Sequence, residues 1–229
     1  MTKFPDVFGT TDEYRNIVLK QGFIDITQIQ PEDVIDAIHD RRWLPKFIDV
    51  FAIINVTGSQ SKFNSILLMA NQRLIKCRLT PKTLVSKLGQ QFLLDPKNDV
   101  GDMAKSIGIK KLIPYICGNF VLAPIGKKSA SNNSWVRLYT DGEVWHYLGA
   151  KSLVNYPSVS VLKVPHSKRA MRIRRNNCRQ LLRCYHEIAE CLRTTIELPF
   201  EKMSGEELRA TVARKMAINR EAVSRELIA

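Results

Sequence analysis

Long apolar runs, closely paired cysteines and catalytic motifs are all missing from this 229-residue chain. The longest apolar runs, 51–56 and 65–70, have the size of a β-strand and fall short of the roughly 18 to 20 residues that cross a bilayer. The first ten residues carry a Lys, an Asp and a Pro in place of a cationic segment followed by an apolar one, so they do not match a secretory signal. We therefore expect a cytoplasmic protein with no membrane partner.

The five cysteines are odd in number, widely spaced and form no C-x-x-C pair. Without an export signal, we do not expect disulfides. Cys178, Cys184 and Cys191 fall in a predicted helix near His186, which leaves a metal site open as an alternative, although zinc sites usually have closer ligand spacing. We favour buried thiols that pack as small apolar side chains, and we expect no metal and no other cofactor.

None of the four histidines accompanies a recognisable arrangement of Ser, Cys or carboxylate, and no phosphate-loop, dinucleotide-binding, zinc-protease or hydrolase motif is present. A nuclease needs carboxylates that hold magnesium. Only Asp95, Asp99 and Asp102 cluster in the sequence, and we interpret them as part of a polar loop. We therefore expect a protein that is not an enzyme, with a metal-dependent nuclease as the enzymatic alternative.

Positive charge is what the chain has in excess, with 35 basic and 22 acidic residues and a net charge of +13. Residues 1–100 hold 13 basic and 11 acidic residues, a net of +2, whereas the remaining residues hold 22 and 11, a net of +11. From Met103 to His186 there are 15 Lys or Arg residues, and Asp141 and Glu143 are the only acids. Such a one-sided field predicts a polyanionic partner, with a solvated basic face as the alternative.

Two short helices are predicted in the first 45 residues, one opened by Thr11 and the other by Pro31. A further short helix is predicted from Pro81. Apolar and β-branched runs predict strands at 47–56, 64–70, 73–78, 112–117, 120–125 and 158–164. The runs 134–139 and 143–148 flank an Asp-Gly turn and predict a β-hairpin.

These patterns predict an α+β fold with a mostly antiparallel β core, an N-terminal helical cap and a long basic C-terminal helix. The corresponding regions are a cap at 1–45, a β-rich core with the basic helix at 46–195, and an amphipathic helical tail at 196–229. The tail opens with a capping-box pattern at 204–207 and continues with a narrow apolar stripe. That stripe fits docking on the core, with self-association as the alternative.

The basic helix is predicted at about 166–193, where the apolar period changes to that of a helix and indicates a face that packs on the sheet. A second stripe lies roughly 125° round the helix axis and is cationic. Its members are Lys168, Arg172, Arg175, Arg179 and Arg183. Because no acid occurs between Glu143 and Glu187, this stripe favours contact with a nucleic-acid backbone over a balanced solvated face.

Part of the core resembles a known family. The segments Leu79–Leu88, Ile113–Ile125 and Ser134–Val136 give a Pro-initiated helix, a strand ending in an apolar-x-Pro step, a polar Ser-rich loop, and a Trp followed by a β-branched residue. This order is similar to that of the competence transcription factor (ComK) family, over roughly 78–144. Ala123-Pro124, the loop of residues 127–134 and Trp135 carry most of the likeness.

The resemblance implies a transcription activator of DNA-uptake genes that binds paired A/T-rich boxes through the minor groove as a self-associating protein. It also implies RNA polymerase and an adaptor–protease system as partners. We expect Lys and Arg side chains to contact phosphates, and loop side chains to enter the narrow minor groove of A-tracts. The predicted DNA-binding residues are Lys127, Lys128, Asn132, Asn133, Arg137, Lys168, Arg169, Arg172, Arg174, Arg175, Arg179 and Arg183.

An RNA-binding or ribosome-associated module is the main alternative, because the same charge would serve it. Tyr139, Trp145 and Tyr147 would support this alternative if they formed an exposed stacking surface on a sheet. A peripheral membrane role is weaker, since the basic helix has no bulky aromatic edge.

Overall fold

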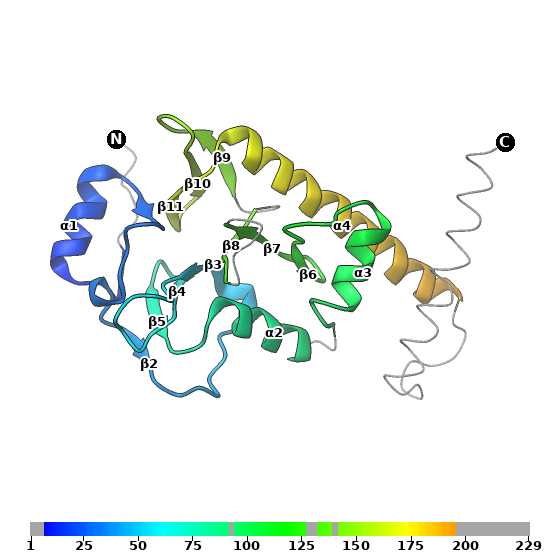
Figure 1. Ribbon diagram of the computed structural model, residues 1–229, viewed down its shortest axis with the longest axis horizontal. Coiled ribbons are helices and arrows are strands. Elements are labelled where there is room, and N and C mark those ends of the chain that lie inside the picture. The colour runs from blue at the N-terminus through cyan, green and yellow to red at the C-terminus, as the bar shows by residue number, and fades with distance from the viewer. Residues whose placement is uncertain (1–6, 92–93, 127–131, 139–141, 196–229) are drawn as a thin grey trace. The chain divides into compact units, whose positions relative to one another are not determined.

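The computed structural model describes residues 7–91, 94–126, 132–138 and 142–195, with side chains to residue 191 (Figure 1). Within them the protein has the predicted α+β fold. The helices are α1 (Asp12–Gln21), α2 (Pro81–Gln91), α3 (Asp99–Ser106) and α4 (Lys168–Thr195), with short 3-10 turns at Pro31–Asp33 and Phe47–Asp49. The strands are β1 (Ile24–Asp25), β2 (Ala37–Ile38), β3 (Val50–Asn55), β4 (Ser65–Met69), β5 (Leu74–Cys77), β6 (Tyr115–Cys117), β7 (Phe120–Ile125), β8 (Ser134–Arg137), β9 (Glu143–His146), β10 (Ser152–Tyr156) and β11 (Ser160–Val164).

The strands form two sheets. The larger has the order β2-β5-β4-β3-β8-β7-β6, and the smaller has the order β1-β11-β10-β9. Neighbouring strands are antiparallel except in two pairs, β1 with β11 and β2 with β5. The prediction of a mostly antiparallel core is therefore confirmed.

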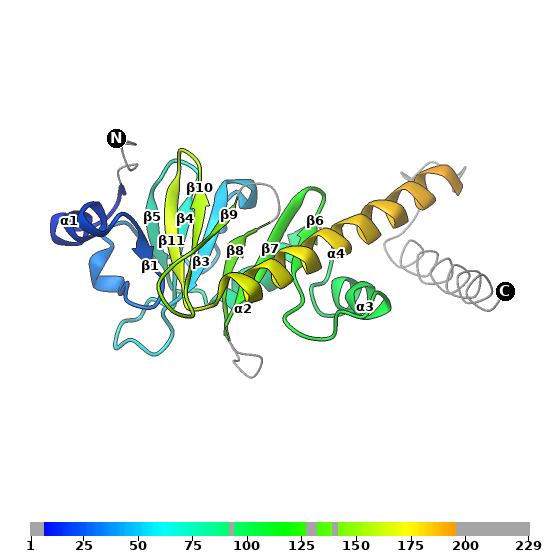
Figure 2. The same ribbon diagram turned by 90° about the horizontal axis from the view of Figure 1, so that it is seen from above.

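The smaller sheet lies over the β3–β5 part of the larger one, as the two views in Figures 1 and 2 agree. Tyr156 of β10 joins the two layers. Its ring meets that of Phe51 edge to face at 5.1 Å between centroids, and its hydroxyl donates to the carbonyl oxygen of Arg137 at 2.7 Å. A buried Tyr hydroxyl needs such a partner, so this bond fixes where β10 crosses the end of β8.

The first 45 residues do more than cap the core. Helix α1 is confirmed, with Thr11 as its N-cap, and the short strands β1 and β2 add to the edges of the two sheets. The second predicted helix is wrong, because Pro31–Asp33 makes only one 3-10 turn and Val34 is extended. The β-branched Val34 and Ile35 favour that geometry, and the Ile35 amide donates to the Gly9 carbonyl at 2.8 Å.

The predicted hairpin of 134–139 with 143–148 is also wrong. Both runs form strands, but β8 pairs with β3 and β7 in the larger sheet, whereas β9 pairs with β10 in the smaller one. Because β8 has a neighbour on each side, it has no edge left for β9. The chain between them therefore passes from one sheet to the other.

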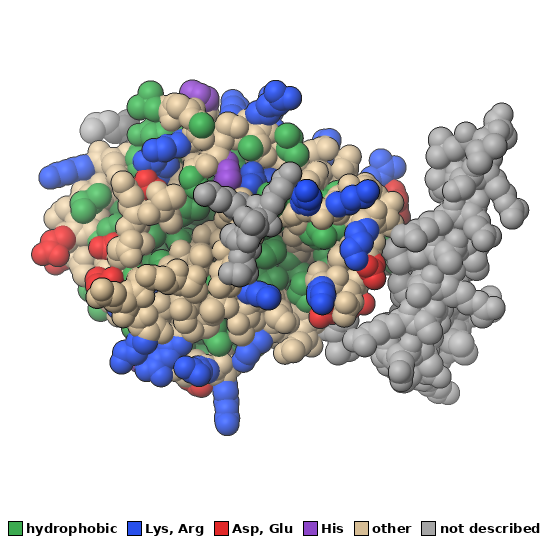
Figure 3. Space-filling model, viewed as in Figure 1, with side chains coloured by type: hydrophobic (Ala, Val, Ile, Leu, Met, Phe, Trp, Pro, Cys, Tyr) green, Lys and Arg blue, Asp and Glu red, His purple; other side chains and the backbone are tan. Residues whose placement is uncertain are grey.

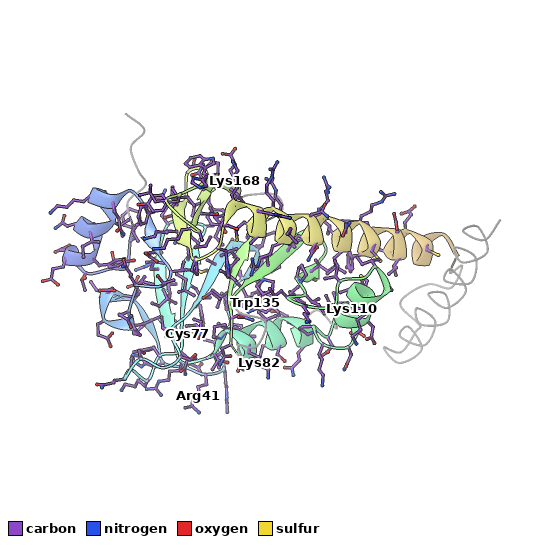
Figure 4. All side chains as sticks on the ribbon, turned by 45° about the horizontal axis from the view of Figure 1, so that its top comes forward. Arg41, Cys77, Lys82, Lys110, Trp135 and Lys168 are labelled. Carbon is purple, nitrogen blue, oxygen red and sulfur yellow. The ribbon has the colours of Figure 1, made fainter. Side chains whose placement is uncertain are left out.

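The chain divides into two compact units within α4, the first ending at Leu181 and the second beginning at Leu182. The sheets, α1 to α3 and the first half of α4 belong to the first unit. In that unit, α4 and α2 lie on opposite sides of β6–β8 (Figures 1 and 4). Among the described residues, no helix has both the length and the hydropathy of a membrane span.

Candidate nucleic-acid interface

Helix α4 begins with cations. Ser167 precedes it, and its hydroxyl oxygen accepts from the Ala170 amide at 3.3 Å, as an N-cap does. Lys168 and Arg169 occupy the first turn, which contains no acid. A helix N-terminus carries a partial positive charge, which repels cationic side chains. Asp or Glu is therefore favoured in the first turn of a helix over Lys or Arg. This end of α4 is therefore unusually positive and favours an anionic partner.

The opposite side of α4 is buried and fixes the helix to the larger sheet. Met171, Cys178 and Leu181 are fully buried, and Arg174 is only 7% exposed. The Arg174 guanidinium donates from Nε to the Pro124 carbonyl at 3.0 Å and from Nη2 to the Gly126 carbonyl at 3.3 Å. Burial lowers the pKa of Arg174. Its bonds to β7 and the turn after it hold the cationic side of α4 in one orientation.

Pro124 explains why β7 has a carbonyl available for this contact. Proline has no amide hydrogen, and the pairing of β6 with β7 stops at Leu122. Pro124 still pairs on its other side with Trp135 of β8. Pro124 and Trp135 are thus cross-strand neighbours beneath the anchor of α4.

The exposed side of α4 forms the candidate interface, which we call the α4 stripe. It consists of Lys168, Arg169, Arg172, Arg175 and Arg179, all of which are exposed. In the described part of the chain, no ion pair involves any of these five. Their side chains, with those of Ile173 and Asn176, line two shallow hollows of about 460 and 410 Å³.

The α4 stripe matches the dimensions of a nucleic-acid backbone. Eleven residues separate its ends, or roughly 17 Å at about 1.5 Å per residue. A duplex carries one charge per about 1.7 Å of axis over its two strands, so a segment of this length carries on the order of ten phosphates, about five on each strand. Figure 3 shows blue Lys and Arg side chains following the course of α4 across the upper right of that view.

The remaining predicted arginines are engaged elsewhere. Arg174 faces inward, so its assignment as a DNA contact is corrected to an anchor of α4. The Arg137 guanidinium donates to the Ile48 carbonyl at 2.7 Å and lies 4.7 Å from the centre of the Phe51 ring. Arg183, in the second unit, pairs with Glu187 at 2.8 Å, one turn further along α4.

The loop residues differ from the expectation that they are free to enter a groove. Asn132 and Asn133 are half-buried, and their Oδ1 atoms are buried without a hydrogen-bond partner among the described residues. The Asn133 side chain lies directly against Gly126, where a side chain would not fit. Both border an open hollow of about 440 Å³ that Asn55 and Thr57 also line. Lys127 and Lys128 lie outside the described residues.

The carboxylates of the nuclease alternative stabilise the start of α3. Asp95 Oδ1 accepts from the Asn98 amide at 2.6 Å, Asp99 Oδ2 accepts from the Asp95 amide at 2.7 Å, and Asp102 pairs with Lys105 at 2.7 Å. The polar loop predicted here is partly wrong, since α3 starts at Asp99. In the portion of the chain that the structure describes, no group of three or more His, Cys, Asp or Glu residues is placed to hold a metal ion.

Two of the three aromatic residues of the RNA alternative, Trp145 and Tyr147, lie among the described residues. Tyr147 meets Phe23 edge to face at 5.3 Å between centroids, and Lys163 Nζ lies 5.5 Å from its ring centre. Trp145 of β9 is 45% exposed, and Tyr139 lies outside the described residues. Of the two that are described, only Trp145 offers an exposed ring.

Comparison of the chain with protein-family models, curated proteins and solved structures gave no match.

The inward position of Arg174 predicts that Arg174→Met lowers stability without affecting DNA contact. Met keeps an apolar stem but loses both donors, so we expect the free energy of unfolding to fall by about 2 kcal/mol, as measured by denaturant titration. Arg175→Met is the matched control on the exposed side. It should leave stability within about 0.5 kcal/mol and instead weaken DNA binding. A contrary result would be a stability loss in Arg175→Met and a loss of DNA binding in Arg174→Met. It would show that Arg175 is the anchor and Arg174 the exposed contact.

Proposed function

We propose that this protein binds double-stranded DNA through the α4 stripe. The observation that carries the proposal is a row of five exposed cations that form no ion pair with the described residues, on a helix whose other side is anchored in the core. Arg forms bidentate bonds with phosphate, and displacement of counterions from DNA supplies most of the non-specific affinity. The stripe would fix the position of the protein on the DNA backbone, and the preference for particular bases would come from other side chains.

We further propose a role in transcription activation at A/T-rich boxes, by self-association of the kind that the likeness to the competence transcription factor family implies. In the structure, Pro124 and Trp135, two of the residues that carry this likeness, pair across β7 and β8 beneath α4. Readout in the minor groove is degenerate, so one copy would distinguish little beyond A·T from G·C. Two copies on paired boxes would raise the specificity to a useful level.

The test is a titration of fluorescent DNA duplex with the full chain, followed by anisotropy at several salt concentrations. Five phosphate contacts predict that the logarithm of the affinity falls with the logarithm of salt at a slope of about −4.5. Competition with structured RNA at one fixed salt concentration distinguishes the RNA alternative. Tighter binding to RNA than to duplex, or binding that salt does not weaken, would contradict the proposal.

The loop between β7 and β8 provides a test of base selectivity. Since Asn132 and Asn133 have buried amide oxygens, Lys127 and Lys128 become the loop residues proposed to enter the minor groove. Replacing both Lys residues with Ala should reduce the preference for A/T-rich over G/C-rich duplex more than it reduces non-specific affinity. Both affinities are measured at the same salt concentration. An equal loss in both would show that the loop only contacts the backbone, and that selectivity resides elsewhere.

A further inference from the structure

A second cationic surface lies at the start of α2. It comprises Arg41 and Arg42, in the turn after β2, together with Lys82 and Lys87 of α2. Lys87 Nζ donates to the Arg41 carbonyl at 3.2 Å, which ties the turn to the helix. Figure 3 shows blue side chains gathered along the lower edge of the view, where Figure 1 places β2, the segment after it and α2. We call these four residues the α2 surface.

Little charge opposes the α2 surface. In the described portion of the chain, none of its four cations forms an ion pair. Asp40 is the acid beside them in sequence, and its Oδ1 accepts from the Arg42 amide at 2.7 Å. The first turn of α2 contains no acid, and Lys82 stands there against the partial positive charge of the helix N-terminus. The α2 surface thus repeats the unbalanced arrangement at the start of α4.

The two cationic surfaces face different directions within the first unit. In Figure 4, Arg41 and Lys82 lie along the lower edge and Lys168 along the upper edge, with the strands between them. A short straight duplex that contacts the α4 stripe cannot reach the α2 surface at the same time. Bending it round the protein is costly, because the persistence length of DNA is about 150 base pairs.

We infer that the α2 surface binds a second segment of double-stranded DNA, so that one copy of the protein bridges two duplexes. This inference rests on the proposed function, because the α4 stripe holds the first duplex. Its partner is identified by charge complementarity: the four cations of the turn and of α2 fit a row of phosphates. Bridging would let each copy hold two duplex segments, in addition to the self-association proposed above.

The experiment measures capture of one duplex by another. A duplex of about 20 base pairs is immobilised on beads, and a fluorescent duplex of the same length is added with the full chain; this length is too short to bend round the protein. Each lost phosphate contact costs roughly tenfold in affinity at 0.1 M salt by counterion release. We expect Arg41→Ala/Arg42→Ala/Lys82→Ala to reduce capture by at least about tenfold, while affinity for one duplex changes little.

The matched control removes the same charge elsewhere, in Lys20→Ala/Lys97→Ala/Lys105→Ala, and should capture the second duplex as the unaltered protein does. If the α2-surface variant also captures it fully, bridging arises from two self-associated copies that each hold one duplex on the α4 stripe, and the inference is wrong. If the unaltered protein binds one duplex but captures no second, the inference fails and the proposed function stands. If it binds no duplex at all, both fail.

Discussion

Replacing Arg172, Arg175 and Arg179 with Ala is expected to weaken DNA binding by about two to three orders of magnitude at 0.1 M salt. The three side chains are exposed, carry no ion pair in the described part of the chain and form the centre of the α4 stripe. Counterion release contributes about 0.9 to the salt slope for each phosphate contact, so the slope should fall by up to about 2.7. Specific and random duplexes should lose affinity alike, as measured by anisotropy across a salt series.

Two control variants separate total charge, local charge and geometry in that experiment. Lys20→Ala/Lys97→Ala/Lys105→Ala removes three charges outside the stripe and should change affinity far less. Changing the same three arginines to Lys keeps the charge and removes the planar fork, so the salt slope should persist while some affinity is lost. An intact fold with unchanged affinity and slope in the triple Ala variant would show that α4 is not the phosphate contact.

Replacing Asp25 with Ala should destabilise the protein by about 3 to 5 kcal/mol, which lowers the melting temperature by roughly 10 °C. Asp25 is 3% exposed and forms an ion pair with Lys163 at 2.7 Å between the parallel strands β1 and β11. Its Oδ1 also accepts from the Thr27 hydroxyl at 2.7 Å. Without the carboxylate, the largely buried Lys163 ammonium loses its ion pair, and the Phe23 and Tyr147 ring centres lie 5.1 and 5.5 Å from it. Thermal and denaturant unfolding measure the loss.

The control for this prediction is Asp12→Ala, which removes an exposed ion pair to Arg15 and should cost less than about 1 kcal/mol. Asp25→Ala combined with Lys163→Met should recover much of the lost stability, because a buried ion pair can be replaced by apolar packing at little cost. Should Asp25→Ala unfold like the unaltered protein, the pair would contribute nothing to the junction of β1 with β11.

The same pair gives a pH dependence. Burial alone would raise the pKa of Asp25, but hydrogen bonds from Lys163 and Thr27 outweigh it and hold the pKa below its usual value. A carboxyl whose pKa is lower in the folded state stabilises the protein above its unfolded pKa of about 3.9. This stability is lost as the pH falls through the lower pKa that Asp25 has in the folded protein. Asp25→Ala should therefore flatten the acid limb of the stability curve.

Local patterns in the sequence predicted most elements but not how the strands are joined. The period of the apolar residues and the helix-capping residues are properties of neighbouring residues, and they can be recognised in the sequence. They predicted the strands β4, β5, β7 and β11 and the helices α1 and α4. The hairpin failed because an Asp-Gly turn between two strand-like runs fits a hairpin locally. Whether β8 has a free edge depends on β3, about 80 residues earlier in the chain.

The candidate site was predicted in outline for a similar reason. The α4 stripe follows directly from a spacing of three and four residues along one helix. Arg174 was included because it is one of a basic cluster, although its spacing from Cys178 and Leu181 already indicates the buried side. The α2 surface could not be predicted, because Arg41 and Lys87 are far apart in sequence and come together only through the fold.

The parallel pairing of β1 with β11 also bears on when the α4 stripe forms during synthesis. Ile24 pairs with Leu162, so the smaller sheet cannot close until nearly all of the described chain has been synthesised. Contacts between such distant residues make folding slow, because the long loop between them must first be ordered. Helix α4 follows β11 directly, and its anchor Arg174 comes later still. The order of synthesis therefore delays the presentation of the α4 stripe until both sheets can form.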